Sequence, residues 1–183
     1  MSNLKFLVVD LFCGAGGTTT GFTQAKYIDS TGKLQNAAKV IACVNHDPVQ
    51  IQSHWANHPE VRHFEEDIRT LDLTDLKVLV QEQKALHPNS LLILWASLEC
   101  TNFSNAKGGQ SRDADSRTLA EHNIRDIKMR ALTVKELLSI QGFPSTYKLK
   151  GNQTQQKKGI GNAVVPHVVK AWTESKARVL VNH

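Results

Sequence analysis

The stretch that decides the fold is Leu7-Val8-Val9-Asp10-Leu11-Phe12-Cys13-Gly14-Ala15-Gly16-Gly17. It begins as an apolar run typical of a buried β-strand and then breaks into glycines. The residues that follow, 18–26, have the pattern of a helix. A strand that leads through a glycine turn into a helix can cradle a nucleotide, because the first helical turn offers unpaired N–H groups and glycine lets the backbone come close. The stretch therefore predicts a binding site for a nucleotide-like ligand near the start of the chain.

The glycine spacing narrows the choice of ligand. Gly14 and Gly16 fit the dinucleotide fingerprint Gly-x-Gly-x-x-Gly, but Thr19 stands where the third glycine belongs. The phosphate-binding Gly-Lys-Ser/Thr loop is absent as well. A nicotinamide-dependent oxidoreductase is therefore disfavoured, and a plain strand-to-helix turn stays open as the alternative.

Composition sets broad limits. A chain of 183 residues with 40% hydrophobic residues suits one domain, and a net charge of +5 permits a polyanionic partner without requiring one. Three cysteines without paired spacing argue against a disulfide framework and for a reducing, cytoplasmic setting. We find neither a secretory signal segment nor an apolar run long enough to cross a bilayer, so no membrane association is expected.

Strand-like and helix-like runs alternate along the rest of the chain. Further strands are expected at 39–44, 61–64 and 90–96, the last buried on both faces, and residues 29–36 are expected to form a polar turn. Helices are expected from Pro48, at 74–86 with Thr74 or Asp75 as the cap, at 133–141 with a Thr133/Glu136 capping box, and at 165–180 beside the first helix. This alternation predicts an α/β fold with a parallel sheet.

Polar residues follow several of these strands. Asp10, 45–47, Asp67 and 97–100 all fall at carboxyl ends, which meet at one edge of a parallel sheet. Ligands of open α/β sheets bind outside that edge. The sequence therefore predicts one composite site built from segments that lie far apart in the chain.

Asp10 to Gly17 resembles the first motif of the DNA cytosine-C5 methyltransferases, where that family binds S-adenosylmethionine (SAM). Four further stretches resemble later motifs in the family's order: Asp67-Ile68, 97–104, 130–144 and 159–166. The resemblance implies a Rossmann-like SAM-dependent methyltransferase fold, with a mostly parallel sheet and helices on both faces. It also implies one catalytic domain over 1–183, with 1–122 as the SAM and catalytic part and 123–183 completing the domain.

The same resemblance assigns a SAM site. It places Phe12 against the adenine ring, the backbone of the glycine turn along the methionine part, and Asp67 at the adenine amino group. The residues expected near SAM are Asp10, Phe12, Cys13, Gly14, Ala15, Gly17, Asn45, His46, Asp67, Ile68, Ser97, Asn162, Ala163 and Val164. The chain departs from the family at Asn45, which replaces a ribose-binding Glu, and an amide binds a hydroxyl more weakly than a carboxylate does. Asp67 has the alternative of a turn or cap residue.

Cys100 is the expected nucleophile, because the family's fourth motif carries a cysteine at this position. Its thiolate would add to C6 of a flipped-out cytosine, which makes C5 electron-rich enough to take a methyl group. Glu99 replaces the family's proline, and a carboxylate beside the thiol raises its pKa unless it points into solvent. Residues 107–113 form a glycine-hinged basic stretch that resembles the loop closing over the base. The alternative for Cys100 is a small buried apolar residue, since a lone cysteine more often has that role than a catalytic one.

The chain lacks two parts of the family pattern, the Glu-Asn-Val motif and the target-recognition region. Either a segment is missing between His122 and Asn123, or the chain is a deleted relative. The expected function is methyl transfer from SAM to C5 of cytosine in double-stranded DNA by a monomer. The alternatives are a SAM-binding but inactive relative, and a metal protein built on His54, His58 and His63, which we disfavour because no cysteine or carboxylate completes a tetrahedral set in the sequence.

Overall fold

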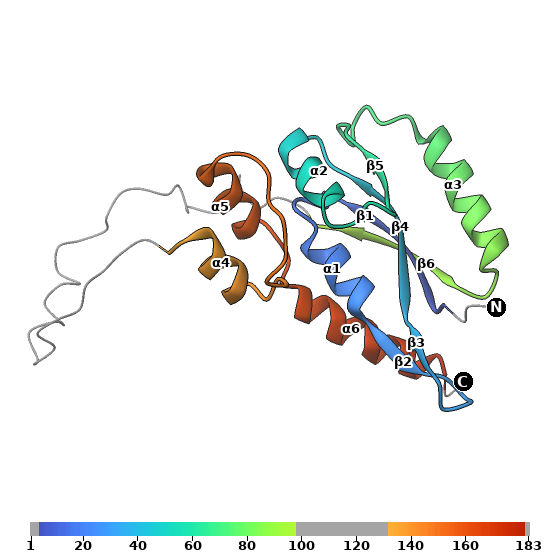
Figure 1. Ribbon diagram of the computed structural model, residues 1–183. Helices are drawn as coiled ribbons and strands as arrows, with labels where there is room; N and C mark the ends of the chain where they lie inside the picture. Colours follow the sequence, from blue (N-terminus) through green and yellow to red (C-terminus); the bar gives the residue numbers. More distant parts are fainter. Residues whose placement is uncertain (1–3, 98–131, 182–183) are drawn as a thin grey trace, which may run out of the picture.

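A four-stranded parallel sheet forms the centre of the molecule. The computed structural model describes residues 4–97 and 132–181 (Figure 1). The strands are β1 (Phe6–Leu11), β4 (Ala38–Val44), β5 (Arg62–Phe64) and β6 (Leu91–Ala96), in the order β5-β4-β1-β6. Because all the pairings are parallel, the carboxyl ends of the strands meet at one edge, as the alternating pattern predicted.

Three helices cover one face of this sheet: α1 (Gly17–Gln24), α2 (Pro48–Trp55) and α6 (Pro166–Val179). Phe22 of α1 is fully buried, and its ring meets Trp95 and Trp172 edge-on at 5.5 and 6.4 Å between centroids. A Cβ at Gly21 would lie 2.5 Å from the carbonyl oxygen of Pro166, so glycine permits the close approach of α6 to α1. The expected packing of the terminal helix beside the first is confirmed.

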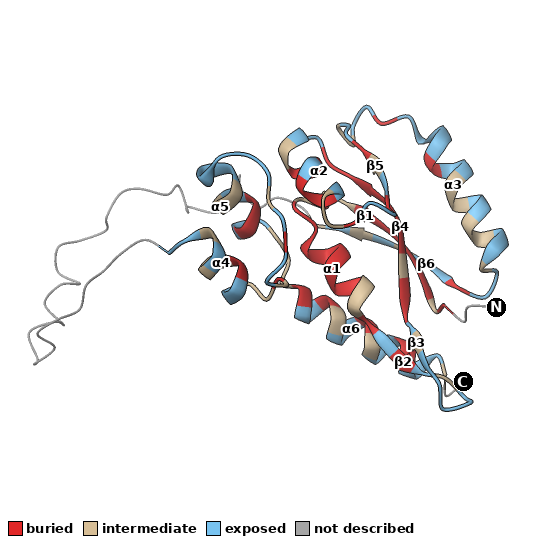
Figure 2. Ribbon diagram, viewed as in Figure 1, coloured by how far each residue is buried: buried red, intermediate tan, exposed pale blue. Residues whose placement is uncertain are grey.

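Helix α3 (Leu73–Leu86) covers the opposite face. Leu7 and Val9 of β1 point toward Leu76 of α3, whereas Phe6 and Val8 point toward α1 and α6, as the two-residue period of a strand requires. Helices therefore lie on both faces, as predicted. In Figure 2 α1 is almost wholly buried, while α3 exposes most of its length. No helix within the described ranges is long and apolar enough to span a bilayer.

Strand β6 differs from its prediction as a strand buried on both faces. Leu91, Leu92 and Leu94 are 52%, 43% and 62% exposed. An apolar groove of about 380 Å³ runs between β6 and α3, lined in part by Leu73 and Val80. The reason is positional, because among residues 4–97 and 132–181 β6 is the last strand of the sheet and only β1 pairs with it.

The segment after α1 also differs from its prediction. The helix ends at Gln24, and a small antiparallel hairpin follows, made of β2 (Lys26–Ile28) and β3 (Leu34–Asn36). Asp29 orders the turn, since its carboxylate accepts the backbone N–H groups of Thr31 and Lys33. The polar composition of 29–36 indicated the turn but not the two short strands that flank it.

Helices α4 (Val134–Ile140) and α5 (Gln153–Gly161) pack on each other around a separate small cluster of Leu138, Phe143, Tyr147 and Ile160. The Thr133/Glu136 capping box is present, as predicted. Helix α5 was not predicted, although Asn152 and Gln155 form a capping box at its start. The three-residue spacing of Asn152 and Gln155 could have predicted the start of this helix, but the polar sequence around it lacks the apolar periodicity of a helix.

The cap of α3 is Asp72, not Thr74 or Asp75 as predicted. Its carboxylate accepts the backbone N–H of Thr74 at 2.9 Å, whereas Asp75 lies inside the first turn. Asp72→Ala should therefore lower the free energy of unfolding by about 1 kcal/mol. Asp75→Ala, the matched control, should cost only about 0.3–1 kcal/mol through the helix dipole. Urea unfolding of both variants measures the difference, and a larger loss for Asp75→Ala would contradict this assignment.

Candidate functional site

The turn between β1 and α1 has an unusual backbone. Phe12, Gly14 and Gly16 have φ values of 58°, 51° and 100°, all in the left-handed region. Phe12 is the sole non-glycine residue with positive φ in the described part of the chain, and this conformation costs roughly 1–2 kcal/mol. Strain of this kind gathers at ligand sites. A Cβ at Gly14 would meet no atom of the described residues within 4 Å, so the backbone is open to a ligand on that side.

The start of α1 can attract a negatively charged group. Gly16 is its N-cap residue, and no side chain among residues 4–97 and 132–181 caps the helix. The first-turn N–H groups therefore lack intrahelical acceptors, and the helix dipole adds partial positive charge at this end. Uncapped N–H groups beside an open glycine backbone suit a carboxylate such as that of an amino acid.

The C-terminal part of the chain closes on this helix start. A Cβ at Gly17 would lie 2.2 Å from the carbonyl oxygen of Val164 and 3.2 Å from the Cβ of Ala163. Gln141 holds the same segment in place, because its side-chain amide donates to the Ala163 carbonyl at 2.7 Å. The structure therefore brings together Gly17, Ala163 and Val164, three of the residues expected near the ligand, while Asn162 is exposed beside them.

Tyr147 ties the two parts of the chain together at the glycine turn. Its hydroxyl donates to the backbone carbonyl of Ala15, a residue with no exposed surface. Burial raises the pKa of Tyr147 above its usual range, so the hydroxyl keeps its proton. The sequence carried no signal for this contact, because it joins residues 132 positions apart.

Tyr147→Phe should lower the free energy of unfolding by about 1–3 kcal/mol, because it leaves the buried carbonyl of Ala15 without a donor. Thermal or urea unfolding of the variant measures the loss. The phenylalanine ring keeps the contact with Phe143, so the variant and the wild type differ in the hydrogen bond and not in ring packing. An unchanged unfolding free energy would show that the hydrogen bond contributes nothing.

The end of β6 also lies beside the start of α1. The backbone N–H of Ser97 donates to the carbonyl of Leu11, and the Ser97 hydroxyl lies 3.4 Å from that of Thr18 in α1. Trp95 orients this hydroxyl by donating its indole N–H at 3.1 Å. Several predicted features lie outside the described residues: Cys100, Glu99, the basic stretch 107–113 and the junction at His122–Asn123. The chain leaves the described part at Ser97, directly beside the helix start.

The residues after β4 serve mainly as local structure. The side-chain oxygen of Asn45 accepts the backbone N–H of Asp47, and Asp47 caps α2 by accepting from Val49 and Gln50. His46 is exposed. Because the side-chain oxygen of Asn45 is already used, only its amide N–H groups are available to donate to a ribose hydroxyl.

Asp67 is held in a turn by Arg69. Its carboxylate accepts both the guanidinium and the backbone N–H of Arg69, and these hydrogen bonds lower the pKa of Asp67 to about 2. Ile68 packs against the cluster that contains Phe64 and Leu76. This geometry fits the turn-residue alternative for Asp67, and an adenine contact would have to share the carboxylate with Arg69.

Asp10 and Cys13 turn their side chains into the core. Asp10 has no exposed surface, and burial raises the pKa of its carboxyl to about 8. Its Oδ2 accepts the hydroxyl of Thr19 at 2.8 Å, while Oδ1 has no partner in the described structure. Cys13 is 5% exposed and lies in the core cluster beneath α1. These two residues can therefore line a ligand only through their backbone.

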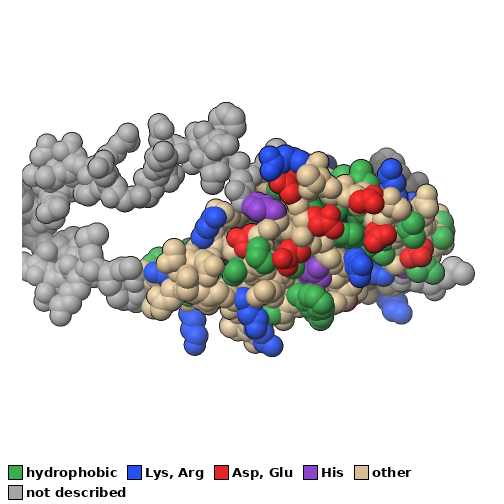
Figure 3. Space-filling view, turned by 90° about the horizontal axis from the view of Figure 1, so that it is seen from above, with side chains coloured by type: hydrophobic (Ala, Val, Ile, Leu, Met, Phe, Trp, Pro, Cys, Tyr) green, Lys and Arg blue, Asp and Glu red, His purple; other side chains and the backbone are tan. Residues whose placement is uncertain are grey.

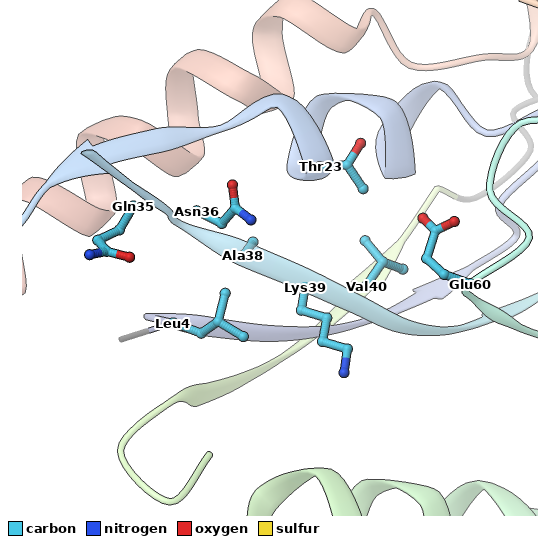
Figure 4. A pocket seen from close by; sticks show the side chains of 8 residues that line it. All are labelled: Leu4, Thr23, Gln35, Asn36, Ala38, Lys39, Val40 and Glu60. Atoms are coloured by element: carbon cyan, nitrogen blue, oxygen red, sulfur yellow. The ribbon is translucent and has the colours of Figure 1, made fainter. Parts of the chain in front are cut away.

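A separate pocket of about 260 Å³ lies over the first half of β4 (Figure 4). Leu4, Ala38 and Lys39 line it together with Thr23 and Glu60. Ala38 pairs with Phe6, at the beginning of β1, so the pocket lies toward the amino ends of the strands. It is thus remote from the glycine turn, at the edge of the sheet where open α/β folds do not bind their ligands.

Comparison with known proteins gives one family. The family model described as C-5 cytosine-specific DNA methylase matches residues 6–128 and 81–177. The chain is similar to the Type II methyltransferase M.AgeI of Thalassovita gelatinovora, with 34% identity over 85 residues, which is 43% of this chain and 20% of that protein. It is also similar to the Type II methyltransferase M.AplI of Arthrospira platensis, with 34% identity over 86 residues, which is 47% of this chain and 22% of that protein. The chain spans about a fifth of the length of these relatives.

Solved structures agree on the fold. The S. pombe Dnmt2 methyltransferase superposes with a TM-score of 0.56 at 12% identity, covering 97% of this chain and 99% of that one. A Spodoptera frugiperda DNMT2 mutant gives a TM-score of 0.53 at 12% identity, covering 94% and 99%. The expected Rossmann-like methyltransferase fold is therefore confirmed.

Proposed function

Because the chain belongs to the C-5 cytosine-specific DNA methylase family, we propose that it binds SAM at the glycine turn and methylates C5 of cytosine in DNA. One observation carries this proposal. Three segments far apart in sequence meet at the start of α1: the glycine turn, Ala163-Val164 and Ser97. They are the segments that the resemblance assigns to SAM.

The described residues fit SAM in shape and charge. The open backbone at Gly14 allows close approach, and the uncapped N–H groups of α1 suit the carboxylate of its methionine part. The ring of Phe12, half-buried at the mouth of the turn, would face the adenine. Asn45, His46, Asp67, Ile68 and Asn162 complete the proposed set around the ligand. When bound, SAM supplies the methyl group.

Cys100 is the proposed nucleophile, three residues after Ser97 in the sequence. Its thiolate adds to C6 of the target cytosine, and the electron pair of the C5–C6 double bond becomes available at C5. After methylation, a base removes the proton from C5 and the electrons of that bond expel the cysteine thiolate. The cytosine must leave the duplex first, since C6 is shielded within the base stack.

The surface indicates where DNA phosphates could bind. Figure 3 shows acidic side chains spread across the face seen from above, with Lys and Arg mostly toward its margins. Lys148, Lys150 and Lys158 are exposed on α5 and the loop before it, and this loop begins next to Tyr147, which contacts the glycine turn. Contacts with phosphates are therefore proposed at 148–158, and they should weaken as salt increases. Monomeric state and cytoplasmic location stay predictions.

Two measurements on the purified chain test the proposal. Equilibrium dialysis with labelled SAM should give saturable binding at one site per chain. Incubation with labelled SAM and cytosine-containing duplex DNA should then give label in DNA, located at 5-methylcytosine. Binding without transfer would favour the alternative of an inactive SAM-binding relative, and absence of SAM binding would overturn both.

A further inference from the structure

A cluster of two cysteines and two histidines lies behind the glycine turn. We call Cys13, Cys43, His54 and His63 the cysteine–histidine cluster. They come from four different elements: the turn after β1, strand β4, helix α2 and strand β5. Cys13, Cys43 and His54 are buried, and Trp55 stacks on the ring of His63 at 5.4 Å. Four ligand-type side chains thus converge from four elements at a protected place.

The separations within the cluster suit a tetrahedral metal ion. The ligand atoms of Cys13, Cys43 and His54 all lie within 4.8 Å of one another. Cys43 Sγ lies 3.7 Å from His54 Nδ1, and His54 Nδ1 lies 2.8 Å from His63 Nε2. With Zn–S near 2.3 Å and Zn–N near 2.0–2.1 Å, a tetrahedral ion separates sulfur from nitrogen by about 3.6 Å and two nitrogens by about 3.3 Å. Cys13, Cys43 and His54 already lie within reach of one ion, whereas His63, which contacts His54 from outside that set of three, would have to move toward the two sulfurs to supply the fourth ligand.

His54 turns its Nδ1 toward Cys43 and His63 and its Nε2 toward Thr19. The Nε2 atom lies 2.9 Å from the Thr19 hydroxyl, which in turn lies 2.8 Å from Oδ2 of Asp10. Metal binding through Nδ1 requires the imidazole proton on Nε2, and the Thr19 hydroxyl is placed to accept it. A histidine that donates its outer N–H toward a carboxyl group is the usual arrangement behind a metal-binding histidine.

Cys43 faces the rest of the cluster, because its Sγ lies 3.7 Å from His54 Nδ1 and within 4.8 Å of Cys13 Sγ. Two thiolates and two neutral imidazoles would balance the charge of a divalent ion, so the buried centre would carry no net charge. The two thiol protons would be released to solvent on binding.

We propose that the cysteine–histidine cluster binds one zinc ion, which fastens the glycine turn to β4, α2 and β5. The sequence alone disfavoured a metal site because no cysteine or carboxylate completed a tetrahedral set with the three histidines. The fold supplies two cysteines, because Cys43 pairs with Asp10 of β1 and the turn after β1 brings Cys13 to the end of β4, where its backbone N–H donates to the Val44 carbonyl. His58, the third histidine considered from the sequence, lies outside the cluster and bonds through its Nε2 to Thr20 at 3.0 Å. The proposed role is structural, because all four positions around the ion would be filled by protein.

Metal analysis of the purified chain tests this proposal directly. The protein is purified under reducing conditions without metal-affinity resin, and zinc is measured by mass spectrometry. We expect about one zinc per chain. After removal of the metal by a chelator under reducing conditions, addition of Co²⁺ should give thiolate-to-cobalt charge-transfer bands and intense visible bands of tetrahedral cobalt. The thermal midpoint should fall by at least about 5 °C without metal and recover when zinc is returned.

Matched variants separate the cluster from neighbouring thiols and imidazoles. Cys43→Ser and His63→Gln should lose most of the zinc, whereas Cys100→Ser and His58→Gln should keep it. If the Cys43 variant does not fold, the wild-type zinc content and cobalt spectrum decide the question alone. A chain that purifies without zinc and gives no thiolate–cobalt bands overturns the proposal. A Cys13–Cys43 disulfide found by mass spectrometry in the freshly isolated protein would overturn it as well.

Discussion

Cys100→Ser should reduce methyl transfer to DNA by at least about 10³-fold. A serine hydroxyl is far less acidic than a thiol, so at neutral pH almost none of it is present as the anion that adds to C6. The two side chains are nearly equal in size, and the substitution removes the nucleophile without emptying its position. Initial rates with labelled SAM and saturating duplex DNA measure the effect.

The affinity for SAM provides the control for this variant. The proposed SAM contacts do not include the Cys100 sulfur, so the dissociation constant should stay within about twofold of wild type, a change of less than about 0.5 kcal/mol. Retained binding with lost transfer places the cysteine in the chemical step. Transfer at the wild-type rate in the variant would show that another group does the chemistry.

Gly17→Ala should weaken SAM binding at least about tenfold, which corresponds to about 1.4 kcal/mol. The added Cβ would lie 2.2 Å from the carbonyl oxygen of Val164, a backbone atom that cannot rotate away. The segment carrying Ala163 and Val164 must therefore shift from the helix start, and the proposed pocket opens. The free energy of unfolding should fall by about 1–3 kcal/mol for the same reason.

Gly161→Ala is the matched control for this substitution. Gly161 ends α5 close to the same segment in sequence, but a Cβ there would meet no atom within 4 Å, and its φ is not positive. This variant should bind SAM as the wild type does and be equally or slightly more stable. If both alanine variants behaved alike in dialysis and in urea unfolding, the contact between Gly17 and Val164 would have no role in the site.

The parts of the fold that the sequence predicted are those controlled by local pattern. The apolar run through Val8 and Val9, the Asn45–Pro48 turn and the Thr133 capping box each carry their signal within a few residues. Short or polar elements were missed because their pattern is ambiguous, as at the hairpin after Gln24 and at α5. Strand β6 was misjudged because an apolar run reports what a strand could bury, whereas its exposure depends on which elements lie beside it.

The site divides in the same way. The glycine turn and Ala163-Val164 were predicted, since motif spacing survives in the sequence. Tyr147 was not predicted to be part of the site, because its hydrogen bond to Ala15 depends on the tertiary fold. The sequence also could not show that Cys13 meets Cys43, because that contact depends on how the turn after β1 packs against the end of β4. Local chemistry can thus be predicted from spacing, while contacts across elements need the packing.

A duplex that carries 5-fluorocytosine at the target position tests the central claim most directly. Fluorine at C5 cannot leave as a proton does, so the step that expels the thiolate is blocked and the enzyme stays bonded to DNA. In the presence of SAM we predict a complex that survives denaturation, with mass spectrometry placing the DNA on Cys100. A complex attached at any other residue, or none at all when unmodified DNA is methylated under the same conditions, would contradict the mechanism.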